Sequence, residues 1–125
     1  MKTLAARERP LHWVGSSKKD LLGFPAAVVD DLGYALGAVQ LGGMPPSAKP
    51  WRGEGPGVFE LAEDYRGDAY RAVFTVRFEK AVYVLHCFQK KSPSGIRTAL
   101  ADVELIHERL KTARADYEGR YETKD

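Results

Sequence analysis

The chain has few of the residues that build covalent or metal-based frameworks. It contains one cysteine, Cys87, and three histidines among its 125 residues. A single cysteine cannot form an internal disulfide, and it cannot supply a zinc site of the usual multi-cysteine kind. The histidines are scattered along the sequence, at positions 12, 86 and 107. The sequence therefore predicts a reduced protein with no metal site and no cofactor.

Long apolar runs and a strong charge excess are also missing. No stretch approaches the roughly 18 apolar residues of a membrane-spanning helix, and the first ten residues lack the apolar centre of a secretory signal. Lys and Arg number 19 against 17 Asp and Glu. This excess is too small to indicate a nucleic-acid partner by itself. We expect a cytoplasmic protein that does not associate with membranes.

The residues that are present suffice for one folded domain. Apolar residues make up 44% of the chain and charged residues 29%, which is typical of a soluble globular protein. A length of 125 residues corresponds to a single domain. We expect a frayed N-terminal tail over residues 1–9, one domain over residues 10–118 and a C-terminal tail over residues 119–125.

Hydrophobic periodicity predicts helices before and after a run of strands. A short strand at Leu11–Val14 precedes a short helix that ends near Leu22. A second helix is expected from about Pro25 to Leu41 and a last one from about Thr98 to Glu118, because apolar residues recur there every three or four positions. The segment Gly42–Pro50 contains three prolines and two glycines, which predicts a loop.

Three further strands are expected between the second and last helices. Residues 58–63 alternate, Tyr70–Phe78 alternates more regularly, and Ala81–Phe88 is almost continuously apolar, as in a central strand covered on both faces. Their short connections predict an antiparallel meander. The predicted fold class is α+β in the order β-α-α-β-β-β-α. It has a largely antiparallel four-stranded sheet, helices packed on one face and a shallow open surface on the other.

Cationic and aromatic residues are expected to gather on that open surface. Arg71 begins one strand, and by two-residue parity His86, Phe88 and Lys90 point the same way at the end of the next strand. Arginine and lysine bind phosphate, and an aromatic ring stacks on an unpaired base. The surface is therefore a candidate RNA site. Further candidate cations come from the adjoining turn, the loop before the sheet and the strand ends: Arg66, Lys49, Arg52, Arg77 and Lys91.

Each of these residues also has an ordinary structural interpretation. Arg77 on a strand is more often a solvated outer residue, His86 a satisfied half-buried histidine and Phe88 a core residue. Lys90 and Lys91 at a strand end commonly form a solubilising turn. Composition and periodicity alone thus indicate only a small basic α+β domain.

The order and spacing of the motifs nevertheless resemble a known family. The pair Tyr70-Arg71 opens one strand, and Leu85-His86-Cys87-Phe88-Gln89-Lys90-Lys91 closes the next. With the helices on either side, over roughly residues 10–115, this pattern resembles the phage-derived, HigB-like branch of the RelE/ParE toxin superfamily. The chain departs from the pattern at Ala62, where many relatives carry arginine.

The resemblance implies the toxin of a type II toxin–antitoxin pair. Many members are endoribonucleases that cleave messenger RNA on the ribosome, and the ParE-type branch instead inhibits DNA gyrase. A third alternative is a catalytically inert domain of this fold that only binds its partner. The implied partners are a cognate antitoxin, typically a helix-turn-helix protein, together with messenger RNA and the ribosome.

For RNA cleavage, the resemblance assigns cationic catalytic positions to Arg71 and to Lys90 or Lys91. The chemistry needs no metal, because a ribose 2′-hydroxyl can attack the adjacent phosphate once a base removes its proton. A lysine beside Arg71 is a candidate base and His86 a candidate acid. Phe88, Arg66, Arg77, Lys49 and Arg52 are the expected RNA-binding residues.

Overall fold

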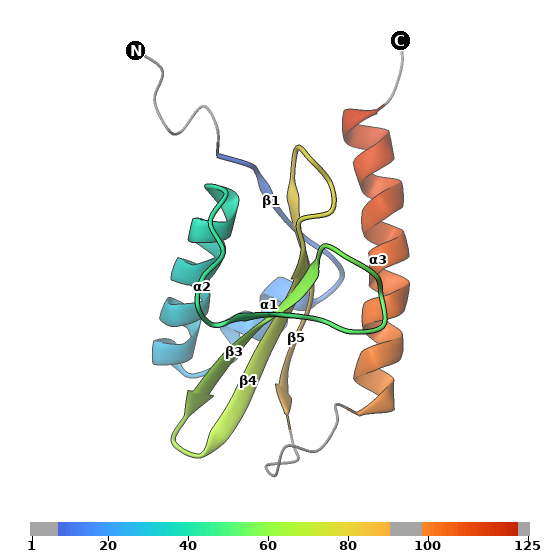
Figure 1. Ribbon diagram of the computed structural model, residues 1–125. Coiled ribbons are helices and arrows are strands. Elements are labelled where there is room, and N and C mark those ends of the chain that lie inside the picture. The colour runs from blue at the N-terminus through green and yellow to red at the C-terminus, as the bar shows by residue number, and fades with distance from the viewer. Residues whose placement is uncertain (1–7, 91–98, 123–125) are drawn as a thin grey trace, which may run out of the picture.

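The computed structural model describes residues 8–90 and 99–122. Within these ranges the elements follow one another as β1 (Leu11–Trp13), α1 (Ser17–Leu22), α2 (Ala26–Gln40), β2 (Ala48–Pro50), β3 (Val58–Tyr65), β4 (Asp68–Thr75), β5 (Val82–Lys90) and α3 (Leu100–Tyr121). Figure 1 shows them as a central sheet flanked by helices. The predicted small α+β class is confirmed.

The sheet has five strands, in the order β1-β5-β4-β3-β2. The expected antiparallel meander is formed by β3, β4 and β5, and β1 lies parallel to β5 at one edge. The strand β2 at the other edge was not expected. Proline is tolerated there because an edge strand needs no donor on its outer side. The prediction of a loop throughout Gly42–Pro50 was therefore wrong for its last three residues.

The helices cover both faces of the sheet, which corrects the prediction that they pack on one. Leu61 and Phe74 belong to the core that contains the buried residues of α1 and α2. Val73 and Tyr83 belong to the core that contains those of α3. Since neighbouring strand residues point to opposite faces, the two cores lie on opposite sides. Figure 1 shows α2 and α3 on either side of the sheet.

The two long helices bury most of the apolar stripes that the sequence predicts, although Leu100 at the start of α3 is exposed. In α2 the fully buried residues include Val28, Leu32 and Val39, and in α3 they include Ile106 and Ala113. The helix α3 continues to Tyr121, beyond its expected end. At the other end of the chain, the backbone N–H of Arg9 donates to the carbonyl of Gln40 at 3.0 Å. Arg9 is thus attached to the C-terminal end of α2.

A bulge in β5 determines which side chains face α3. His86 pairs with Val73 but Val84 pairs with Phe74, so Leu85 is an extra residue in the strand. Both Leu85 and His86 therefore lie on the α3 side, and the alternation continues from His86 toward Lys90.

No helix of the described residues is long and apolar enough to cross a membrane.

Candidate functional site

Five of the predicted site residues, His86 among them, lie on the sheet face that α3 partly covers. Arg71 pairs with Phe88 across β4 and β5, and Lys90 pairs with Ala69, two residues further along the same face. Diagonal neighbours of this kind lie roughly 7–8 Å apart, within reach of long side chains. Lys49 shares the face through the register of β2 with β3. We call Lys49, Arg71, Phe88 and Lys90 the Arg71 face.

Two carboxylates that the sequence reasoning missed hold the Arg71 guanidinium. Arg71 Nε lies 3.7 Å from Glu60 Oε1, and Nη1 lies 3.4 Å from Asp64 Oδ1. Nη1 also donates to the carbonyl of Tyr70 at 2.9 Å. The Arg71 side chain is 12% exposed and is therefore fixed in one place. Its charge is partly neutralised, so the face is less cationic than the sequence suggested.

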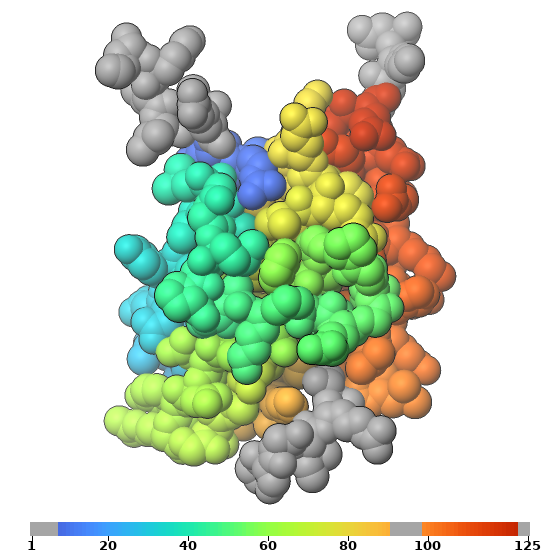
Figure 2. Space-filling view, in the orientation of Figure 1, coloured from blue at the N-terminus to red at the C-terminus, as the bar shows by residue number. Residues whose placement is uncertain are grey.

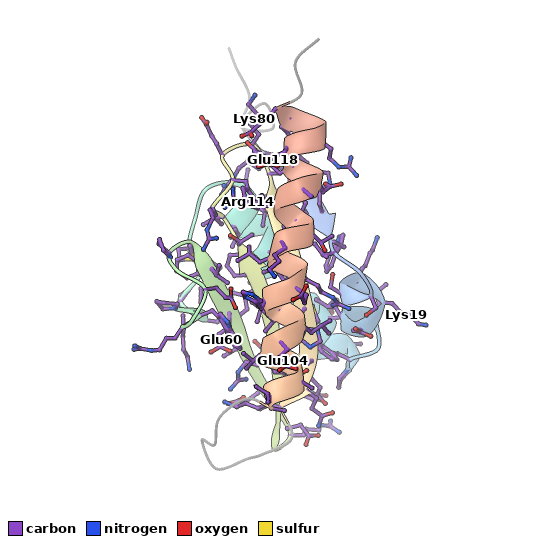
Figure 3. The ribbon with its side chains drawn as sticks, turned by 90° about the vertical axis from the view of Figure 1, so that its right-hand side faces the viewer. Lys19, Glu60, Lys80, Glu104, Arg114 and Glu118 are labelled. Carbon is purple, nitrogen blue, oxygen red and sulfur yellow. The ribbon has the colours of Figure 1, made fainter. Side chains whose placement is uncertain are left out.

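The register places Ala62 directly opposite Arg71 on the same face. Glu60 and Asp64 lie two residues before and after Ala62, so they flank it on that face. Figure 3 shows Glu60 beside α3 rather than beneath it. Ala62, where the resemblance led us to expect arginine, thus faces the candidate site. Two-residue spacing around Ala62 was the sequence signal that could have identified both carboxylates.

His86 faces α3 and not the open part of the sheet. Its Nε2 lies 2.8 Å from Asp102 Oδ1, and its Nδ1 lies 3.4 Å from Arg109 Nη1. Its ring stacks on Phe88, with a centroid distance of 4.9 Å and an interplanar angle of 17°. Both His86 and Phe88 are buried. This geometry supports a positioning role for His86, which holds Phe88 and the beginning of α3.

Arg77 lies far from the Arg71 face. Six residues along the chain separate it from Arg71, which corresponds to roughly 20 Å along an extended strand. Its guanidinium donates to the carbonyl of Pro56 from Nε at 3.1 Å and from Nη2 at 2.9 Å, and also to the carbonyl of Glu54. Arg77 therefore holds the segment that precedes β3. Figure 2 shows this segment, in green, on the front of the molecule, where it extends to the orange residues of α3.

Arg77 instead lines a groove of about 360 Å³ between that segment and α3. His107 Nδ1 lies 3.0 Å from Glu54 Oε1 and joins the two walls. Lys111 and Arg114 are further lining residues from α3, and Figure 3 shows Arg114 on this helix. The groove mixes charges of both signs and lies apart from the Arg71 face.

The remaining candidates are more dispersed. Arg66 occupies the β3–β4 turn, where its guanidinium carbon lies 5.2 Å from the ring centroid of Tyr65. Arg52 is exposed in the segment before β3. Lys91 lies outside the described residues. The structure thus brings Arg71, Phe88 and Lys90 together, with Lys49 on the same face, and does not bring Arg77 to them.

Two further features of the described residues concern metal ligands and the single thiol. They contain no group of three or more side chains able to hold a metal ion. Burial raises the pKa of the Cys87 thiol to about 12. The thiolate is the nucleophilic form of cysteine, so Cys87 is not a nucleophile at neutral pH.

Comparison with known proteins identifies a family for this chain. The sequence profile of a family described as "Phage derived protein Gp49-like (DUF891)" matches residues 19–111. The matched region begins in α1, ends within α3 and includes the whole Arg71 face. No curated protein and no solved structure gives a significant match to the chain.

Proposed function

Because the chain belongs to the phage-derived Gp49-like family, we propose that it is a HigB-like toxin that cleaves messenger RNA on the ribosome. The Arg71 face is the proposed active site. The observation that carries the proposal is that Arg71, Phe88 and Lys90 lie together on one sheet face. They are the residues of the motifs that resemble RelE/ParE toxins, and Arg71 and Lys90 supply positive charges suited to a phosphate.

The proposed reaction uses the 2′-hydroxyl of the RNA as its nucleophile. The O2′–P bond forms while the P–O5′ bond breaks, which leaves a cyclic 2′,3′-phosphate and a free 5′-hydroxyl. A base accepts the 2′ proton, and an acid donates a proton to the leaving O5′. The phosphate gains negative charge in the transition state, and cations already fixed near it stabilise that charge. DNA lacks the 2′-hydroxyl and is not cleaved by this route.

Glu60 is a candidate base in addition to the lysines. Its carboxylate lies 3.7 Å from Arg71 Nε, and its side chain is 20% exposed. A carboxylate can accept a proton directly, and Arg71 would hold it next to the bound phosphate. Glu60→Gln keeps the shape of the side chain and removes this capacity. The variant is therefore expected to abolish cleavage if Glu60 is the base and to leave most activity if Lys90 is.

A domain that only binds its partner is the second candidate. The pairing of Arg71 with Glu60 and Asp64 favours it, because a bound phosphate has to compete with these carboxylates. Under either candidate the proposed partner is an antitoxin that covers the Arg71 face. Acidic groups on that antitoxin would complement Lys49 and Lys90.

The test is induced expression in a bacterial host, followed by mapping of transcript 5′ ends. We expect new 5′-hydroxyl ends with the wild type. Arg71→Ala should reduce cleavage by about 10²–10³, equivalent to about 3–4 kcal/mol of transition-state stabilisation. Lys90→Ala should also reduce it. Lys19→Ala removes an exposed lysine from α1 (Figure 3) and serves as the matched control.

Thermal unfolding of each variant shows whether the fold is intact. Wild-type cleavage by a folded Arg71→Ala protein would contradict the active-site assignment. Growth arrest with intact transcripts and reduced DNA supercoiling would indicate gyrase inhibition instead. Normal growth with intact transcripts would leave the partner-binding domain as the better description.

A further inference from the structure

The helix α2 has apolar residues on its outer side as well as on its buried side. Tyr34 is 85% exposed and Leu41, at the C-terminal end of α2, is 55% exposed. The only charged residues in the helix are Asp30 and Asp31. A surface helix normally has a polar outer face, and a helix that is apolar all round is normally buried. The outer side of α2 therefore has the character of an interface.

This outer side combines a projection with a hollow. Residues 30, 34, 37 and 41 follow a spacing of four, three and four, so they share one side of the helix. Tyr34 projects from this stripe. Beside it, a Cβ atom added to Gly33 or Gly37 would meet nothing within 4 Å, so the surface is open above both glycines. An aromatic ring from another molecule can approach the backbone there.

We propose that a second copy of this chain packs on α2, antiparallel and related by a two-fold axis. In this arrangement Tyr34 of each copy lies over Gly37 of the other. The same register places Asp30 of one copy opposite Leu41 of the other. A two-fold contact requires a surface that is complementary to itself. The stripe meets this requirement because the Tyr34 side chain and the open surface above Gly37 lie at equal distances on either side of the middle of the stripe.

The charges at the two ends of α2 favour a second copy over an unrelated helix. Asp30 and Asp31 lie in the N-terminal half. Arg9 lies at the C-terminal end, where its Nη2 donates to the carbonyl of Val39 at 3.0 Å. Antiparallel pairing brings Asp30 of each copy toward Arg9 of the other, and it also opposes the two helix dipoles. Each copy thus carries both the acidic and the basic group that this pairing requires.

This interface is independent of the proposed RNA chemistry. The α2 core and the Arg71 face lie on opposite sides of the sheet, and Figure 1 shows α2 across the sheet from α3. A dimer formed through α2 leaves both Arg71 faces accessible. The contact is small, because a helix of 15 residues is only about 22 Å long. We therefore expect a dissociation constant on the order of micromolar.

The test is sedimentation velocity of the purified full chain over a concentration series that spans the micromolar range. The wild type should shift from monomer to dimer with increasing concentration. Gly37→Gln fills the hollow and replaces glycine by a better helix former. It should weaken the dimer at least about tenfold while leaving the melting temperature of the dilute protein unchanged or higher. Tyr34→Ala should weaken the dimer similarly.

Leu100→Ala is the matched control, because Leu100 is an apolar residue of α3 that is 69% exposed. It should dimerise like the wild type. A wild type that stays monomeric throughout the series would overturn the proposal, even if another protein were found to bind α2. A dimer that is unaffected by both Gly37→Gln and Tyr34→Ala would also overturn it. We expect Gly37→Gln to cleave RNA at the wild-type level. A loss of dimerisation therefore bears on the α2 interface, and a loss of cleavage bears on the proposed function.

Discussion

Replacing Ala62 by arginine tests the Arg71 face by adding a charge instead of removing one. Ala62 lies directly opposite Arg71, and such pairs have Cβ atoms about 4.5–5.5 Å apart. A guanidinium at position 62 would lie between Glu60 and Asp64, which now hold Arg71 at 3.7 and 3.4 Å. It would share these carboxylates and make Arg71 more available to a phosphate.

The expected size of the effect follows from the charges involved. Two unit charges 4 Å apart near a protein surface interact by about 4 kcal/mol before desolvation. The new arginine would attract two carboxylates and repel one guanidinium, so we expect the stability of the protein to change by no more than about 1 kcal/mol. A new charge-assisted contact to RNA contributes about 1.5–3 kcal/mol, which is roughly 10- to 100-fold in affinity at low salt.

The assay is fluorescence anisotropy with a labelled single-stranded RNA at several salt concentrations. Each added phosphate contact should steepen the plot of log affinity against log salt by about 0.7. Ala62→Gln has a long polar side chain without charge and is the matched control. Equal affinities and equal salt slopes for folded Ala62→Arg and Ala62→Gln proteins would refute the placement of an RNA phosphate beside Arg71.

Three further predictions concern titratable groups elsewhere in the fold. Burial, followed by a hydrogen bond to Asp31, raises the pKa of Glu63 above its usual 4.5. Such a group stabilises the fold only while protonated, and this is lost as pH rises through the folded-state pKa. Glu63→Gln should therefore raise the melting temperature at pH 7 and change it little at pH 4, and equal shifts at both would contradict the assignment. Tyr83→Phe removes a 2.6 Å hydrogen bond to Asp116. It should cost about 1.5–3 kcal/mol in urea unfolding and, in an NMR titration, bring the lowered pKa of Asp116 back toward its usual value. Burial raises the pKa of Cys87 to about 12, so a disulfide reagent should label it only on unfolding, and rapid labelling of the native protein would be inconsistent with this burial.

The sequence predicted the elements whose periodicity is long and regular. The meander and the two long helices were found in this way. The strand β2 was missed because three residues that include Pro50 carry no period to detect. The placement of the helices was wrong although the sequence contained the relevant signal. The apolar run Ala81–Phe88 requires a cover on each face of the sheet, and helices on one face alone cannot provide it.

The candidate site was predictable only as far as strand geometry determines it. Two-residue parity placed Phe88 and Lys90 on one face, and the bulge at Leu85 did not disturb this because it precedes both. The partners of these residues depend on side-chain reach and tertiary packing. Asp102 meets His86 only because α3 crosses the sheet there. Such contacts have no signature in the local sequence.

The charge balance of the Arg71 face bears on how an RNA substrate would be captured. Lys49, Arg71 and Lys90 face Glu60 and Asp64, which leaves a net charge of about +1 on this part of the sheet. RNA binding by electrostatics alone requires several phosphates to be neutralised, and one net charge gives only a weak, shallow salt dependence. Under the proposed function, free RNA would be bound weakly and a second surface would deliver the messenger RNA to this face. A ribosome holding the message would meet that need, so the ion pairs of Arg71 are compatible with a ribosome-dependent toxin as well as with an inert domain.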